Sequence, residues 1–182
     1  MQPTTRYPQS PLMVLSPAPS RPEDNRTSAP RPADLGGLTV GLLDNNKPGA
    51  SVILKHLGEL LRGRGAAEVR YWCKPHPSGP SQYVSEAAKE ADIVISGVGD
   101  CGSCSSWSLR DALDVEAQGR PTVTLVSQPF LQKTRIEADA LGLAGAPIFA
   151  VEHPMATRPD DNLRSEAEGL LEAITTSLVR AG

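Results

Sequence analysis

Short apolar runs alternate with amphipathic stretches along the chain from residue 38 onward. The run at 38–44 is apolar almost throughout and ends in Asp44, which is typical of a strand buried on both faces of a sheet. The stretch at 47–62 has valine and leucines available for one helical face and a proline near its start, so it predicts a helix that ends at Gly63.

The same alternation continues to the C-terminus. Further strands are predicted at 67–73, 93–98, 122–127 and 148–152, and further helices at 83–90, 105–118, 131–141 and 163–179. Strands that alternate with helices in this way are typical of parallel βαβ units with right-handed crossovers. The pattern therefore predicts a single doubly wound, three-layer α/β domain with about five parallel strands, flavodoxin-like or Rossmann-like, over residues 37–182.

Residues 1–36 show no such periodicity. They hold nearly half of the chain's 17 prolines, separated by serine, threonine, arginine and asparagine. A segment of this composition buries too little apolar surface to offset the entropy lost on ordering. We therefore expect residues 1–36 to form a disordered, proline-rich tail.

Composition and charge exclude some classes of partner. A chain of 182 residues with a net charge of −3 gives no electrostatic reason to bind nucleic acid or an anionic membrane. No apolar run approaches the roughly 20 residues that span a bilayer, and the N-terminus lacks the order of a signal peptide. We expect a cytoplasmic protein that acts on a small molecule, either as a monomer or as an oligomer.

Two of the three cysteines form a Cys-x-x-Cys pair, Cys101 and Cys104, between the predicted strand at 93–98 and the predicted helix at 105–118. At a helix N-terminus, unpaired backbone N–H groups and the helix dipole stabilise a thiolate and lower the first thiol's pKa from its free value of about 8.5. The second cysteine, one turn further on, is placed to attack whatever adduct the first one forms. The pair therefore indicates reactive thiol chemistry.

Metal and nucleotide sites have weaker support. A structural zinc site needs four ligands, and the sequence offers no second pair with the required spacing. Gly97, Gly99 and Gly102 have the spacing of a dinucleotide-binding turn, but the next strand does not end in the acidic residue expected about 20 residues later. We expect no metal and no cofactor.

Polar or reactive side chains follow every predicted strand, and in a parallel sheet these strand ends line one crevice. The candidates for catalysis are Cys101, Cys104, Asp100 and His153. The candidates for substrate binding are Asp44, Asn45, Lys47, Lys74, Gly102, Ser103, Ser105 and Gln128.

Several of these candidates have a simpler structural explanation. Asp44 and Asn45 are equally suited to capping the first helix. Lys74 is either a pocket cation, which would clamp an anion or stabilise a thiolate, or a solvated loop lysine. His153 is either a general acid or base within reach of the thiols or a hydrogen-bonded loop histidine.

The segment from Gly99 to Trp107, with the sequence GDCGSCSSW, resembles the motif of the UGSC family of proteins and selenoproteins. The segment at 42–48, Lys74 with its proline and His153 with its proline are also similar to that family, so the resemblance covers roughly residues 38–180. In the family the first cysteine position can hold selenocysteine. The resemblance implies that Cys101 is the nucleophilic position and Cys104 the resolving thiol.

Three hypotheses follow for the function. The leading one is a cysteine-dependent oxidoreductase that acts on a small electrophilic metabolite and is regenerated by a thiol reductant. The second is a cysteine-dependent isomerase, lyase, hydratase or racemase without net redox change. The third is a redox-sensing binding protein whose disulfide state switches a surface.

Overall fold

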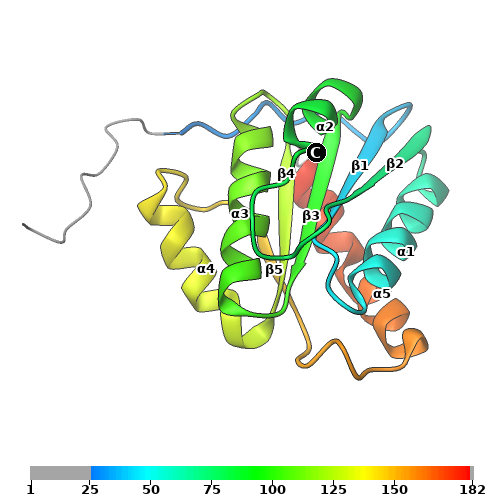
Figure 1. Ribbon diagram of the computed structural model, residues 1–182. Coiled ribbons are helices and arrows are strands. Elements are labelled where there is room, and N and C mark those ends of the chain that lie inside the picture. Colours follow the sequence, from blue (N-terminus) through cyan, green and yellow to red (C-terminus); the bar gives the residue numbers. More distant parts are fainter. Residues whose placement is uncertain (1–25, 181–182) are drawn as a thin grey trace, which may run out of the picture.

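Five parallel strands form one sheet in the order β2-β1-β3-β4-β5 in the computed structural model, which describes residues 26–180 (Figure 1). The strands are β1 (Thr39–Asp44), β2 (Glu68–Cys73), β3 (Ile93–Gly99), β4 (Thr122–Ser127) and β5 (Ile148–Val151). The helices are α1 (Ala50–Gly63), α2 (Val84–Glu90), α3 (Gly102–Glu116), α4 (Gln128–Ala140) and α5 (Asp160–Leu178). This strand order is the flavodoxin-like one, so the predicted doubly wound α/β class is confirmed.

Helices cover both faces of the sheet, as the apolar strand runs require. Leu42 of β1 and Ile95 of β3 pack with α1 and α5 in one core. On the opposite face, Leu43 and Val94 pack with α2 and the end of α3, and a further cluster joins α3 to α4. Successive residues of a strand point to opposite faces, so a strand covered on both sides is apolar at every position.

The strand order places a topological switch between β1 and β3. The chain leaves β1 toward α1 on one face and leaves β3 toward α3 on the other. In folds of this class, ligands bind outside the carboxyl ends of the two strands at such a switch. The Cys-x-x-Cys pair follows β3 directly. The topology therefore places the pair where ligands bind in this class of fold.

Three helices begin three residues before their predicted starts. The structure begins α3 at Gly102 rather than at 105, α4 at Gln128 rather than at 131 and α5 at Asp160 rather than at 163. At α4 the reason is that β4 ends at Ser127 and passes into the helix with no loop, with Pro129 in its first turn. Proline is compatible with a first turn because its missing N–H has no intrahelical partner there.

Part of the predicted tail belongs to the folded body. Residues 1–25 lie outside the described residues, but residues 26–36 pack on the domain, and Ala29 and Leu35 are buried. The buried carboxylate of Glu116 accepts the backbone N–H of Ala29 at 2.8 Å and also pairs with Arg31. The packed part of the chain therefore extends to the N-terminal side of the boundary predicted at residue 36, because polar contacts without any periodicity hold residues 26–36.

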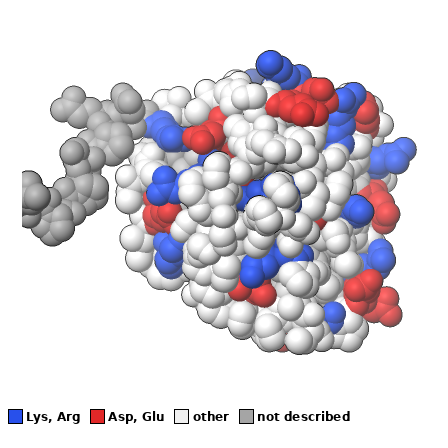
Figure 2. All heavy atoms as spheres, viewed as in Figure 1, with Lys and Arg blue, Asp and Glu red and all other residues white. Residues whose placement is uncertain are grey.

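On the described part of the face seen in Figure 2, Lys and Arg adjoin Asp and Glu in several small groups, and uncharged residues lie between these groups. Within residues 26–180, no helix combines the length and the apolar character needed to cross a bilayer.

We predict that Glu116→Ala destabilises the domain by about 3 kcal/mol, because it leaves the buried N–H groups of Ala29 and Thr122 without an acceptor and Arg31 without its partner. Urea unfolding measures the change. The matched control is Asp114→Ala, which removes a half-exposed ion pair with Arg26 and should change stability by no more than about 0.5 kcal/mol. Equal effects of the two substitutions would contradict the role of Glu116.

Candidate active site

The thiol of Cys101 caps α3. Its Sγ accepts the backbone N–H of Cys104 at 3.3 Å, the bond that a serine or aspartate side chain usually accepts at a helix start. The carbonyl oxygen of Cys101 accepts both the N–H of Ser105 at 3.0 Å and its hydroxyl at 2.7 Å. The helix therefore begins one turn earlier than predicted. The sequence did not indicate this start, because cysteine is not among the residues that normally mark an N-cap.

Glycine at position 99 allows this helix to begin so close to the strand. A Cβ on Gly99 would lie 2.6 Å from the Cα of Ser105, and one on Gly97 would lie 2.8 Å from the carbonyl oxygen of Leu125. Nothing lies within 4 Å of a Cβ built on Gly102. Two of the three glycines with dinucleotide-like spacing are thus explained by close packing within the protein.

The two thiols have unlike environments. Cys101 is partly exposed, whereas Cys104 is fully buried, and the Cys104 Sγ accepts the N–H of Asp100 at 3.2 Å. Burial and the hydrogen bond to Cys101 raise the pKa of Cys104 to about 11.

Burial alone would also raise the pKa of Cys101, but four nearby groups outweigh it and lower the pKa below its ordinary value. They are the thiol and backbone N–H of Cys104, the hydroxyl of Ser103 and the charge of Lys47. Cys101 is therefore the more readily ionised and the more accessible of the two thiols.

A histidine and a carboxylate meet beside the thiol pair. The Nδ1 of His153, which follows β5, lies 2.8 Å from Oδ1 of Asp100 and 3.3 Å from the hydroxyl of Ser127 at the end of β4. Phe130 packs edge-on against the imidazole with the ring centres 6.1 Å apart. Because Nδ1 is engaged, the Nε2 atom is the nitrogen left for proton transfer in the described part of the chain.

Asp44 and Asn45 build the turn between β1 and α1. The carboxylate of Asp44, which is buried, accepts the hydroxyl of Tyr71 at 2.5 Å, and burial raises its pKa. The amide of Asn45 donates to the carbonyl of Val98 at 2.8 Å and to Ser108 at 3.1 Å. Neither residue caps α1, whose N-cap is Gly49, so helix capping was the wrong structural explanation for them. Asp44 thus holds the turn against β2, and Asn45 holds it against β3 and α3.

Lys47, another predicted substrate-binding residue, lies in the same turn. Its charge acts on both thiols. Its backbone N–H is held by Asn45 at 3.2 Å, and its ammonium lowers the pKa of both Cys101 and Cys104. No ion pair of Lys47 occurs within residues 26–180. A cation at this place favours the thiolate form of either cysteine.

Lys74 lies in a buried ion pair rather than in solvent. Its Nζ lies 2.9 Å from Oδ2 of Asp111 on α3 and donates to the carbonyl of Gly79 at 2.7 Å. The second oxygen of Asp111 accepts the N–H of Ser81 at 2.8 Å. These contacts hold the 74–80 loop on α3, so the geometry gives no support to Lys74 as an anion clamp or thiolate stabiliser.

The remaining predicted residues are also of two kinds: some have hydrogen bonds that hold the framework, and others are exposed. Ser103 is exposed beside Cys101, with its hydroxyl 3.7 Å from the Cys101 sulfur and 3.0 Å from the hydroxyl of Ser78. The hydroxyl of Ser105 is engaged with the Cys101 carbonyl. Gln128 is the exposed first residue of α4. Ser103 is thus the serine that is open to a ligand.

Sequence reasoning missed Lys133 and Glu137, which lie beside the motif. The ammonium of Lys133 on α4 donates to the carbonyl of Gly102 at 3.1 Å and pairs with Glu137 at 2.6 Å. Lysine and glutamate four residues apart are common on exposed helix faces, so the pattern gives no reason to single them out. Asp111 was also missed, although an acidic residue on the buried side of a helix is a usable indication of an ion pair.

Groups of three or more histidine, cysteine or acidic residues that could hold a metal ion do not occur within residues 26–180.

We predict that Gly99→Ala costs about 2 kcal/mol or more of stability, because the new methyl group would overlap the backbone of α3. The control is Gly102→Ala, where space is open and the change should stay within about 0.5 kcal/mol. Thermal unfolding of both variants measures the difference. A Gly99 variant as stable as the parent would contradict the close-packing explanation.

Comparison with known proteins identifies the family. A model described as the UGSC family matches residues 13–180 and so begins before the resemblance at 38–180 found from the motifs. No curated protein matches the chain. The matched range includes both thiols, His153 and the packed segment at 26–36. The chain belongs to the UGSC family.

Proposed function

We propose that this protein is a thiol-dependent enzyme in which Cys101 attacks a small electrophilic metabolite and Cys104 resolves the adduct. The observation that carries the proposal is the division between the two thiols. Cys101 is accessible with a lowered pKa, and Cys104 is buried with a pKa raised to about 11. A nucleophile must be ionised and exposed, whereas a resolving thiol should not compete for the substrate.

The proposed cycle has two displacements and one reduction. The Cys101 thiolate attacks the electrophilic atom, forms a covalent bond to it and expels a leaving group with its electron pair. Cys104 gives its proton to Nε2 of His153, and the resulting thiolate attacks the Cys101 sulfur and forms a disulfide. The bound fragment leaves with the electron pair of its bond to Cys101 and takes up the proton from Nε2. A small dithiol or a protein dithiol supplies two electrons and two protons to restore both thiols.

The contacts between the thiols support this order of events. One cause of the raised pKa of Cys104 is its hydrogen bond to the Cys101 sulfur, and another is the charge on that sulfur. Both causes weaken once Cys101 carries an adduct and is no longer an anion. The Asp100 N–H, which favours the Cys104 thiolate, remains in place. Cys104 therefore becomes more acidic when its attack is needed.

His153 and Lys47 complete the proposed chemistry. With Nδ1 held by Asp100, the Nε2 atom of His153 protonates the departing fragment. The ammonium of Lys47 favours the Cys101 thiolate and suits substrates with an anionic or polar group. Ser103, exposed beside Cys101, is the nearest hydroxyl for binding such a group.

The Asp100–His153 hydrogen bond also favours a second candidate, a cysteine-dependent isomerase, lyase, hydratase or racemase. In this reaction Cys101 adds reversibly to an activated double bond, or the two thiols exchange protons with a carbon, while His153 transfers a proton. No disulfide forms and no reductant is consumed.

The reaction with an aromatic disulfide that releases a coloured thiolate tests the order of attack. In a Cys73→Ser background, the intact pair should release two coloured thiolates per chain and end as a Cys101–Cys104 disulfide. Cys104→Ser should release one and keep a mixed disulfide on Cys101, and Cys101→Ser should react slowly.

Two outcomes would contradict the proposal. If Cys101→Ser reacts as fast as the parent, Cys101 is not the attacking thiol. If the intact pair releases one coloured thiolate and keeps the mixed disulfide, Cys104 does not resolve, and the reaction without net redox change is the better account.

We predict a pH dependence for alkylation of Cys101 in the Cys73→Ser, Cys104→Ser variant. This variant keeps a hydroxyl and a backbone N–H at position 104, the hydroxyl of Ser103 and the charge of Lys47, all of which favour the Cys101 thiolate. The thiolate and hence the rate should therefore persist to a lower pH than for a free thiol. Lys47→Gln should move the midpoint to higher pH, because it removes a charge that favours the thiolate. The control is Lys55→Gln, whose ammonium lies over the ring of Tyr71 and should leave the midpoint unchanged. A Lys47 variant with an unchanged midpoint would contradict the role given to this charge.

A further inference from the structure

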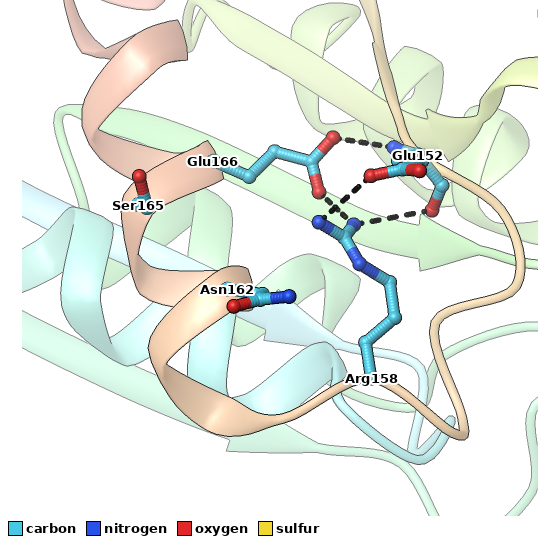
Figure 3. A pocket seen from close by; sticks show the side chains of 5 residues that line it. All are labelled: Glu152, Arg158, Asn162, Ser165 and Glu166. Atoms are coloured by element: carbon cyan, nitrogen blue, oxygen red, sulfur yellow. Dashed lines mark hydrogen bonds and ion pairs between the residues drawn. The ribbon is translucent and has the colours of Figure 1, made fainter.

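An ion cluster lies at the start of the loop that carries His153. Figure 3 shows the guanidinium of Arg158 between the carboxylates of Glu152 and Glu166. Its Nη2 lies 3.1 Å from Oε2 of Glu152, and its Nη1 pairs with Glu166. With Asn162 and Ser165, these residues line a pocket of about 300 Å³.

The second oxygen of Glu166 has a separate partner, the backbone N–H of Glu152. Glu152 follows the last residue of β5, which is an edge strand of the sheet. A backbone group at such an edge has no neighbouring strand to pair with. The Glu166 carboxylate, which is largely shielded from solvent, provides the missing acceptor.

These contacts hold the residue next to His153. On the other side, Met155 is fully buried, and its carbonyl accepts the N–H of Arg158 at 3.0 Å. Arg158 also reaches back to Glu152, so the loop is closed on itself as well as fastened to α5. The backbone on both sides of His153 is thus anchored.

The imidazole needs such anchoring because the core does not enclose it. Its side chain is 39% exposed, and its contacts are the hydrogen bonds to Asp100 and Ser127 and the edge of Phe130. A shift of about 1 Å in the loop would lengthen the 2.8 Å contact to Asp100 beyond hydrogen-bond range. The position of the backbone therefore decides whether this contact exists.

We propose that Glu166, together with Arg158, is a positioning residue that fixes His153 against Asp100. The proposal rests on the proposed function in that it gives His153 a task, the transfer of a proton from Nε2. Glu166 acts through the backbone of Glu152 and touches neither the thiols nor the imidazole. It sets the direction in which Nε2 points, and productive proton transfer needs that geometry.

The test uses nitrogen NMR of the imidazole side chains, since the chain has three histidines. In Glu166→Ala, the Nδ1 resonance of His153 should move toward its position in Asp100→Ala, and the Glu152 amide should exchange about tenfold faster. Glu166→Gln keeps one acceptor oxygen, so its His153 Nδ1 resonance and its Glu152 exchange rate should lie between those of the parent and of Glu166→Ala. Ser165→Ala and Asn162→Ala, in the same pocket, should leave the His153 Nδ1 resonance unchanged. The resonances of His76 should be unchanged in every variant.

Two outcomes would overturn the proposal. One is a His153 resonance in Glu166→Ala that coincides with the parent's. The other is an equal shift in Ser165→Ala, which would indicate a general loosening of the pocket. If Glu166→Ala does not fold, Glu166→Gln and Arg158→Lys carry the same comparison. Because the resonance is read without turnover, this test can fail while the thiol experiments succeed, and the reverse also holds.

Discussion

The first turn of α3 packs directly on the last residues of β3, and the site depends on that contact. Glycine at position 99 lets the backbone of Ser105 come close, so the helix begins at once and the thiol of Cys101 caps it. The same turn buries Cys104 under the chain while Cys101 stays at the surface. Free cysteines share one pKa, so the difference between the two thiols arises from this packing.

Charged side chains hold the segments around this turn from three directions. Lys133 on α4 binds the first carbonyl of α3, and Lys74 binds Asp111 and so fastens the 74–80 loop to the middle of α3. Arg158 and Glu166 fasten the loop of His153 to α5. Supporting contacts of this kind restrict the motion of the side chains that they surround.

Most of the fold could be predicted because the core is recorded in the local pattern. A strand covered on both faces is largely apolar, and β1 was located from that property, whereas the other strands were located from the alternation of strand and helix signals along the chain. The helix starts were less accurate, since the cap of α3 is a cysteine and β4 enters α4 without a loop. The segment at 26–36 was missed because its attachment to Glu116 and Arg180 is polar and nonperiodic.

The sequence by itself determined the fold class and the place of the Cys-x-x-Cys pair at the carboxyl end of a strand. Only the tertiary structure decided which strand-end residues hold the framework, as Asn45 and Lys74 do, and which face the thiols, as Lys47 does. The reason is that burial and hydrogen-bond partners come from residues far apart in the chain. Asp100 and His153 are 53 positions apart, and no local pattern records that they meet.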